Sequence, residues 1–374
     1  MKKRLVLIAV AICLLLSGCS IFDGSYVHVV PHREQQSTGN SRIVSADNYR
    51  QLRSVVEAMV DYGSESGVIN VADFDQNLVE KHMTAVAFHI RETYPIGAYA
   101  VEEITYEIGT NSGRPAIAVN ISYRHSRIEI QKIRSVQNLQ KAKTVIGEAL
   151  DSHSANLVLE IEKYEEQDFS QIVEDYVQSN PNKVMEMPQV ASAVYGTGEA
   201  RVVELTFTYQ NSRDDLRTMQ SRVDDIFDSA ALYVSSEASD SRKLNQLYGF
   251  LMERFDYKLE TSITPAYSLL NHGVGDSRAF AMVYAAMCRQ ADLECYIIKG
   301  TRMGEPWTWN MVLDNGIYYH VDLLRSYNEG GFGKYLDTEM SGYVWDYSAY
   351  PACRENIIDP QDPEETEEIT APTE

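Results

Sequence analysis

The chain has 374 residues, of which 44% are hydrophobic and 23% charged, so its composition excludes an intrinsically disordered protein and leaves room for two or three domains. Its 33 basic and 54 acidic residues give a net charge of −21. A surface this acidic repels phosphates, which excludes a general nucleic-acid-binding or anionic-lipid-binding face, and we expect no nucleic-acid partner.

The N-terminus has the pattern of an export signal. Three basic residues at 2–4 precede twelve apolar residues at 5–16, a stretch too short to span a bilayer. The segment LSGC that follows resembles the lipobox of bacterial lipoproteins, in which the chain is cut before the cysteine and the thiol is acylated. This resemblance implies a signal peptide at 1–18, lipidation of Cys19, and an extracytoplasmic protein anchored to the bacterial cell membrane. An ordinary secretory signal with an incidental cysteine is the alternative.

Two polar segments are expected to flank the folded part of the chain. Residues 19–42 lack hydrophobic periodicity, which predicts a tether. Residues 355–374 hold eight acidic residues, three prolines and no basic residue. Such a segment cannot bury enough apolar surface to fold, so we expect a disordered acidic tail.

The middle of the chain carries one pattern twice. Alternating apolar residues at 117, 119, 121 and 123 predict a half-buried strand, and the same alternation returns 86 residues later, at 203, 205, 207 and 209. A Ser-Arg pair and a predicted helix follow each strand, and a helix that ends near a proline and a strand that ends in Gly-Thr precede it. We therefore expect a duplicated strand-helix-hairpin-helix module, with repeats at 43–150 and 151–238, although any two capped hairpin-helix units share such features.

The chain from 239 to 354 has a different character. Gly273 and Gly275 permit a tight turn, after which Asp276 or Ser277 can cap a helix. A side chain at that place lies in the positive field of a helix N-terminus, where a cysteine would become reactive. The segments "WTWNMVLD" and "IYYHVDLL" then flank an Asn-Gly pair at 315–316, which is a strong signal for a two-residue hairpin turn.

Three segments of this region, in order, resemble a known family. The run "AYSLLNHGVGDSRAFAMVYAAMC…ECYIIKG…GEPWTWNMVLDNGIYYHVDLL" is similar to the transglutaminase-like domain, which has a papain-like fold. That family carries a cysteine after the glycine turn, a histidine that begins an H-A-W-N segment, and an aspartate in an H-V-D strand. By this resemblance the three positions fall on Ser277, Trp307 and Asp322, so only the aspartate matches. The expected fold class is α+β, with the duplicated module followed by a transglutaminase-like domain.

The geometry of the predicted hairpin also brings Trp307 close to Asp322, and this inference does not depend on the family resemblance. A two-residue turn at 315–316 places position 307 diagonal to Asp322, about 7–8 Å away at the backbone. The carboxylate could orient a histidine at 307 as a catalytic base, whereas an indole has one N–H donor and no basic nitrogen. His320, on the same strand face as Asp322, and His272, in the turn before the helix, are the alternatives for a relocated base.

The sequence thus favours a catalytically impaired domain that binds a peptide or protein at the cell envelope. Trp309, Tyr318 and Tyr319 are candidates to line a groove with Trp307, although such aromatic residues are more often core residues. The alternative function is an acyl-transfer enzyme or amide hydrolase that uses Ser277 with His320 as the base, and a purely structural spacer is the third interpretation.

The cysteines add one open question. Three of them, Cys288, Cys295 and Cys353, lie beyond the predicted lipidation site. They allow one disulfide, while small buried thiols are the alternative. The cysteines and histidines lack the spacing of metal ligands, so we expect neither a metal site nor a cofactor.

Overall fold

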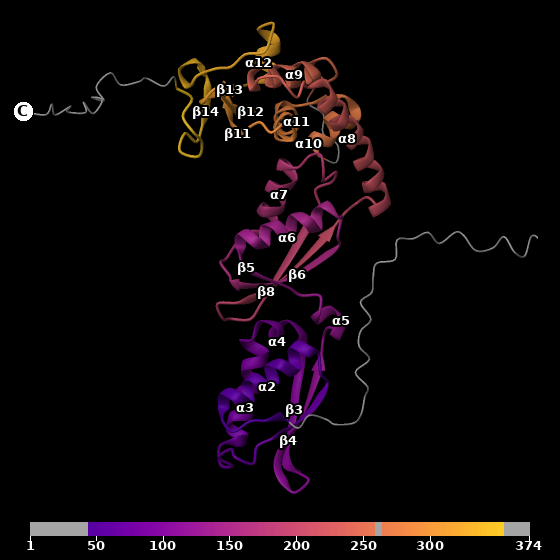
Figure 1. Cartoon of the computed structure of the whole chain (residues 1–374), viewed down its shortest axis with the longest axis vertical. Helices are drawn as coiled ribbons and strands as arrows, with labels where there is room; N and C mark the ends of the chain where they lie inside the picture. The colour runs from indigo at the N-terminus through magenta and orange to yellow at the C-terminus, as the bar shows by residue number, and fades with distance from the viewer. Residues whose placement is uncertain (1–43, 259–263, 355–374) are drawn as a thin grey trace, which may run out of the picture. The chain divides into compact units, whose positions relative to one another are not determined.

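The computed structural model describes residues 44–258 and 264–354, in which helices pack against mainly antiparallel sheets (Figure 1). The predicted α+β fold class is confirmed. The predicted signal peptide, Cys19, the tether and the acidic tail lie outside the described residues. Within those residues, no helix combines the length and the apolar character needed to cross a membrane.

The first sheet has the strand order β1-β2-β4-β3. The helices α2 and α3 cover it, because their apolar side chains, among them Leu52, Val56 and Met83, share one buried cluster with Ile117 and Val119 of β4. The elements of this part are β1 (Val44–Ser45), α2 (Tyr49–Tyr62), β2 (Ser66–Asn70), α3 (Val79–Glu92), α4 (Pro95–Ala100), β3 (Val101–Asn111), β4 (Arg114–Tyr123) and α5 (Arg127–Ile130).

The second sheet has the equivalent strand order, β5-β6-β8-β7. Ile146 and Leu150 of α6 and Val173 of α7 pack in one cluster with Leu159 of β6 and Leu205 of β8. The elements of this part are β5 (Arg134–Asn138), α6 (Leu139–Asp151), β6 (Asn156–Lys163), α7 (Phe169–Ser179), β7 (Gln189–Tyr195), β8 (Arg201–Thr208) and α8 (Arg213–Tyr233).

The order of elements in the two sheets can be compared with the predicted duplication. Each contains, in order, a strand, a helix, a strand, a helical segment, an antiparallel hairpin and a closing helix, and the hairpin's first strand lies at the sheet edge. The repeat boundary at 150 is wrong, however, because β5 pairs in parallel with β6 and α6 is the crossover between them. The closing helices also differ, since α5 has four residues and α8 has 21. We interpret the two parts as two copies of one structural unit, with the boundary between the copies before Arg134.

The remaining elements build the part with the family resemblance, around a sheet of order β13-β12-β11-β14. A short parallel pair, β9 with β10, lies beside the start of α11. The elements are α9 (Asp240–Met252), β9 (Asp256–Tyr257), α10 (Pro265–His272), β10 (Val274–Gly275), α11 (Ser277–Gln290), β11 (Cys295–Arg302), β12 (Glu305–Asp314), β13 (Ile317–Val321), α12 (Leu323–Asn328), the 3₁₀ turn η1 (Asp337–Glu339) and β14 (Tyr343–Trp345).

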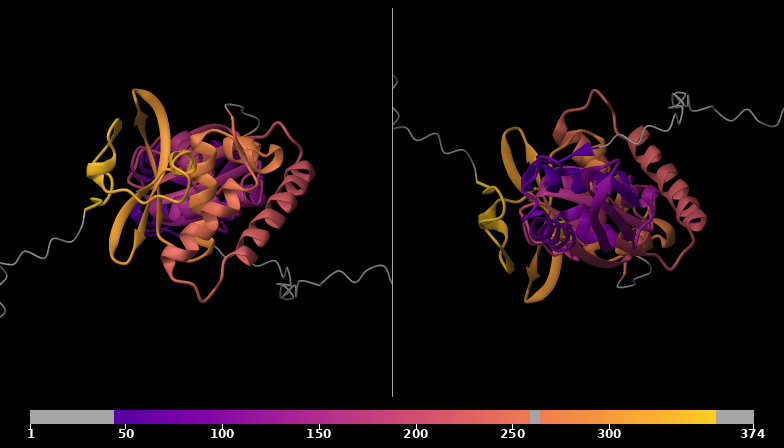
Figure 2. Two further views of the ribbon diagram at one scale, coloured as in Figure 1. Left: turned by 90° about the horizontal axis from the view of Figure 1, so that it is seen from above. Right: turned by 90° about the horizontal axis from the view of Figure 1, so that it is seen from below.

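This sheet has a buried cluster on each face. On one face, Phe280 and Val283 of α11 pack against Val312 of β12. On the other, Trp309 of β12 packs with Trp345 of β14. Figure 2 shows the helices and the yellow C-terminal segment on opposite sides of the orange strands. The residues expected from the sequence to form the site are therefore divided between the two faces of this sheet.

Candidate functional site

Ser277 is the first residue of α11, and its hydroxyl faces β12. The helix is capped by Asp276, whose Oδ1 accepts a hydrogen bond from the Ala279 backbone N–H at 2.9 Å. Ser277 is therefore not the cap itself. Its side chain is only 9% exposed, and its Oγ accepts a hydrogen bond from the backbone N–H of Thr308 at 3.3 Å. The hydroxyl thus has a structural partner on the neighbouring strand.

The Trp307 side chain forms a direct hydrogen bond with the Asp322 side chain. In the pairing of β12 with β13, Asp314 lies opposite Ile317 and Asn310 lies opposite Val321. This register agrees with a two-residue turn at 315–316. With this register, Trp307 Nε1 donates a hydrogen bond to Asp322 Oδ2 at 2.8 Å. An indole N–H therefore occupies the place beside the carboxylate where a catalytic base would need an imidazole.

Asp322 is a buried carboxylate, 2% exposed, that accepts hydrogen bonds through both oxygens. Its Oδ1 caps α12 by accepting from the backbone N–H groups of Leu324 and Arg325, both at 3.1 Å. Its Oδ2 accepts from the Tyr343 hydroxyl at 2.6 Å and lies 3.5 Å from the Arg302 guanidinium. Burial and the Asp322 carboxylate raise the pKa of the Tyr343 hydroxyl far above its ordinary value, so Tyr343 stays a donor.

The space around Ser277 is closed. It is lined by Ser277, Thr308 and Asp322 together with apolar side chains of α11 and α12, and it has no room for a water molecule. A substrate carbonyl could not approach the hydroxyl without movement of these side chains.

His320 does not take the place of the missing base. Its Nδ1 accepts a hydrogen bond from Trp309 Nε1 at 3.0 Å, so the ring proton must lie on Nε2, which donates to Asp337 Oδ1 at 3.0 Å. Both ring nitrogens therefore have hydrogen-bond partners, and the buried ring packs against Trp345. Among the hydrogen bonds of residues 44–258 and 264–354, none joins Ser277 to an imidazole, and the exposed His272 contacts Asn271. The relocated base at His320 was therefore wrong.

Comparison with known proteins agrees with the predicted family. Residues 228–323 match the transglutaminase-like superfamily. The chain contains a transglutaminase-like domain. No curated protein matches the chain.

Three solved structures are similar to the chain. A crystal structure of a TGase has 9% identity and a TM-score of 0.26; the match covers 58% of this chain and 63% of that one, which is less than two thirds of its length. A candidate cysteine protease from Cytophaga hutchinsonii has 13% identity and a TM-score of 0.25, with 42% and 70% covered. A candidate protease from Parabacteroides distasonis has 9% identity and a TM-score of 0.22, with 68% and 39% covered.

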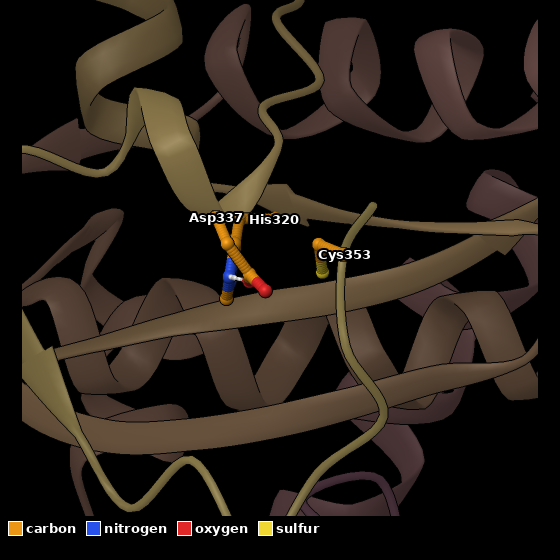
Figure 3. A group of neighbouring side chains, drawn as sticks. All are labelled: His320, Asp337 and Cys353. Atoms are coloured by element: carbon orange, nitrogen blue, oxygen red, sulfur yellow. Dashed lines mark hydrogen bonds and ion pairs between the residues drawn. The ribbon is translucent and has the colours of Figure 1, made fainter. Parts of the chain in front are cut away.

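Within the part of the chain that the structure describes, His320, Asp337 and Cys353 form a cluster of metal-ligand residue types (Figure 3). One ligand atom from each lies within 4.8 Å of the others. A histidine that binds metal through one nitrogen normally donates a proton from the other, but Nδ1 of His320 is an acceptor from Trp309. Burial also raises the pKa of the Cys353 thiol to about 12, which opposes the thiolate that a metal requires. The cluster therefore fits a hydrogen-bonded core better than a metal site.

The predicted groove aromatics do not form one surface in the transglutaminase-like domain. Trp309 is only 1% exposed and packs against Trp345, so its assignment to a groove was wrong. Tyr318 and Tyr319 are half-buried and pack against clusters on opposite faces of the sheet, because successive strand side chains alternate. These two tyrosines therefore cannot line one groove together.

The structure instead places two other side chains beside Trp307. The ring of Tyr257, from β9, lies 6.0 Å from the Trp307 ring, and the Arg302 guanidinium lies 5.2 Å from it. Trp307 is half-buried, while Tyr257 is 46% exposed. No sequence pattern indicates a role for Tyr257, because it lies 50 residues before Trp307 and in a two-residue strand.

Proposed function

We propose that the protein is a lipid-anchored extracytoplasmic lipoprotein whose transglutaminase-like domain binds an extended peptide or protein segment at the cell envelope without cleaving it. The observation that carries this proposal is the 2.8 Å hydrogen bond from Trp307 Nε1 to Asp322, which puts a non-basic indole where a general base would be needed. The anchor is inferred from the basic, apolar and LSGC segments of the first nineteen residues.

The chemistry of Ser277 supports the loss of catalysis. A serine hydroxyl is a weak nucleophile unless a neighbouring base accepts its proton, and the field of a helix N-terminus that activates a thiol does not suffice for it. The hydroxyl of Ser277 instead accepts a hydrogen bond from Thr308. An active acyl-transfer enzyme or hydrolase based on Ser277 and His320 is disfavoured because both nitrogens of His320 are occupied elsewhere.

The surface around Trp307 supports binding over a purely structural role. Trp307 is not fully buried, and both the exposed ring of Tyr257 and the cationic Arg302 lie beside it. Aromatic side chains with one polar group, next to an arginine, are the residue types that concentrate binding energy in protein interfaces. Asp322 holds both Trp307 and Arg302, so the surface is preorganised.

Replacement of Trp307 by alanine should weaken ligand binding without unfolding the domain. We expect the Kd for soluble peptide fragments of the cell wall, measured by isothermal titration calorimetry, to rise about tenfold or more. Tyr327→Ala removes a similarly large but more exposed aromatic side chain, 60% exposed, and is the matched control. Circular dichroism would verify folding of both variants. Equal affinities of the wild-type protein and the Trp307→Ala variant would contradict the proposed binding surface.

The predicted anchor has its own test. Full-length protein produced in a bacterial host should fractionate with membranes, whereas the Cys19→Ser variant should lose acylation and move to the soluble extracytoplasmic fraction. Intact-mass measurement of the membrane form would report the added acyl chains. Membrane association that survives the Cys19→Ser change without any acyl modification would refute lipidation at this residue.

A further inference from the structure

Two thiols of the transglutaminase-like domain meet where α11 ends and β11 begins. Both thiols are free in this structure, and the side chains of Cys288 and Cys295 pack in one apolar cluster with the fully buried Tyr284, where they interact electrostatically. Cys288 has no exposed surface, whereas Cys295 is half-buried at the margin of the same apolar cluster. The pair thus consists of one inner and one outer thiol.

Backbone hydrogen bonds hold the short chain segment between the two cysteines. The Leu293 N–H donates to the Cys288 carbonyl at 2.9 Å, and the Leu313 N–H donates to the Glu294 carbonyl at 3.2 Å. Cys295 itself pairs with Val312 in the central sheet. The approach of the thiols therefore depends on a short local connection.

We propose that Cys288 and Cys295 form an intramolecular disulfide in the mature protein. The inference rests on the export included in the proposed function, because disulfides persist in oxidising extracytoplasmic compartments. The oxidant would be a small-molecule or protein disulfide. The Cys295 thiolate attacks one of its sulfurs and releases the first thiol; Cys288 then attacks the mixed disulfide and releases the second. Two cysteine thiols are thereby oxidised to one disulfide while the oxidant's disulfide is reduced to two thiols.

The surroundings of the pair indicate when the bond forms. Burial raises the pKa of the Cys288 thiol well above its ordinary value, so its thiolate is scarce in the folded protein and exchange there is slow. The bond closes during folding, before α11 and β11 exclude the oxidant. Cys353 lies in the cluster on the other face of the sheet and stays a thiol, which accounts for the odd number of cysteines.

Refolding of the purified protein in a buffer with oxidised and reduced glutathione tests the proposal. After free thiols are alkylated with N-ethylmaleimide, peptide mapping by mass spectrometry should show the peptides that contain Cys288 and Cys295 joined, about 2 Da lighter than the sum of their thiol forms. Cys353 should carry the alkyl group, and the Cys353→Ser variant should keep the cross-link.

The Cys295→Ser variant should contain no disulfide, and its Cys288 should be alkylated only under denaturing conditions. Alkylation of both Cys288 and Cys295 in the refolded wild-type protein, or a cross-link to Cys353, would overturn the proposal. The wild-type map decides the question even if the Cys295→Ser variant fails to fold. Because this readout involves neither Trp307 nor a ligand, its failure is distinguishable from failure of the proposed binding function.

Discussion

Replacing Ser277 by cysteine and Trp307 by histidine in one chain should create a reactive thiol. A histidine at 307 would face Asp322 Oδ2, which lies 2.8 Å from the indole nitrogen, and the carboxylate would orient it toward α11. The two replacements together therefore rebuild both the nucleophile and the base.

The gain can be estimated from thiol chemistry. At pH 6, lowering a thiol pKa from about 8.5 to about 6 raises the thiolate fraction roughly 100-fold, while its intrinsic nucleophilicity falls roughly tenfold, so alkylation should accelerate about tenfold. The Ser277→Cys single variant is the matched control, because it has the thiol and the helix N-terminus but lacks the imidazole. Iodoacetamide labelling of residue 277, followed over pH 5–9, gives both the rate and the pKa. Identical profiles for the single and double variants would show that position 307 does not face position 277.

The Asp322→Ala variant should lose a large part of the stability of the transglutaminase-like domain. The substitution leaves the Trp307 N–H, the Tyr343 hydroxyl and the first N–H groups of α12 without an acceptor in a buried site, and it leaves Arg302 unpaired. Loss of one partner from such a buried network costs about 3 kcal/mol or more of unfolding free energy.

Urea unfolding followed by tryptophan fluorescence would measure this effect. The Asp346→Ala variant is the control, because Asp346 is an exposed carboxylate of the same domain whose side chain bonds only Ser348 and the local turn. The urea concentration at the unfolding midpoint of the Asp346→Ala variant should stay near that of the wild-type protein. Unchanged stability of the Asp322→Ala variant would mean that the carboxylate does not hold these elements together.

The contact between Trp307 and Asp322 could be predicted because a short turn determines it. Asn315 and Gly316 both adopt positive φ angles, 51° and 80°, as a two-residue hairpin of this type requires. Once that turn is fixed, the register of β12 and β13 follows residue by residue. Hairpin geometry is local, so a single sequence was sufficient to place Trp307 near Asp322.

The role of His320 could not be predicted in the same way. Strand alternation placed its side chain on the same strand face as Asp322, but the partners of its two nitrogens come from Trp309 and from Asp337 in η1, 17 residues further along the chain. The contact of Tyr257 with Trp307 was missed for a similar reason, since Tyr257 reaches the proposed binding surface from β9, which is far from β12 in sequence. Periodicity reports which residues share a face and does not report what covers that face.

Among the described residues, no base contacts the Ser277 hydroxyl, and labelling with an active-site acyl probe measures whether that hydroxyl is reactive. Purified wild-type protein and its Ser277→Ala variant would be treated with a fluorophosphonate and a p-nitrophenyl ester, and the adducts located by peptide mass spectrometry. We expect no labelling of Ser277 above the background seen with other serines. Stoichiometric modification of Ser277, absent from the Ser277→Ala variant, would contradict this expectation.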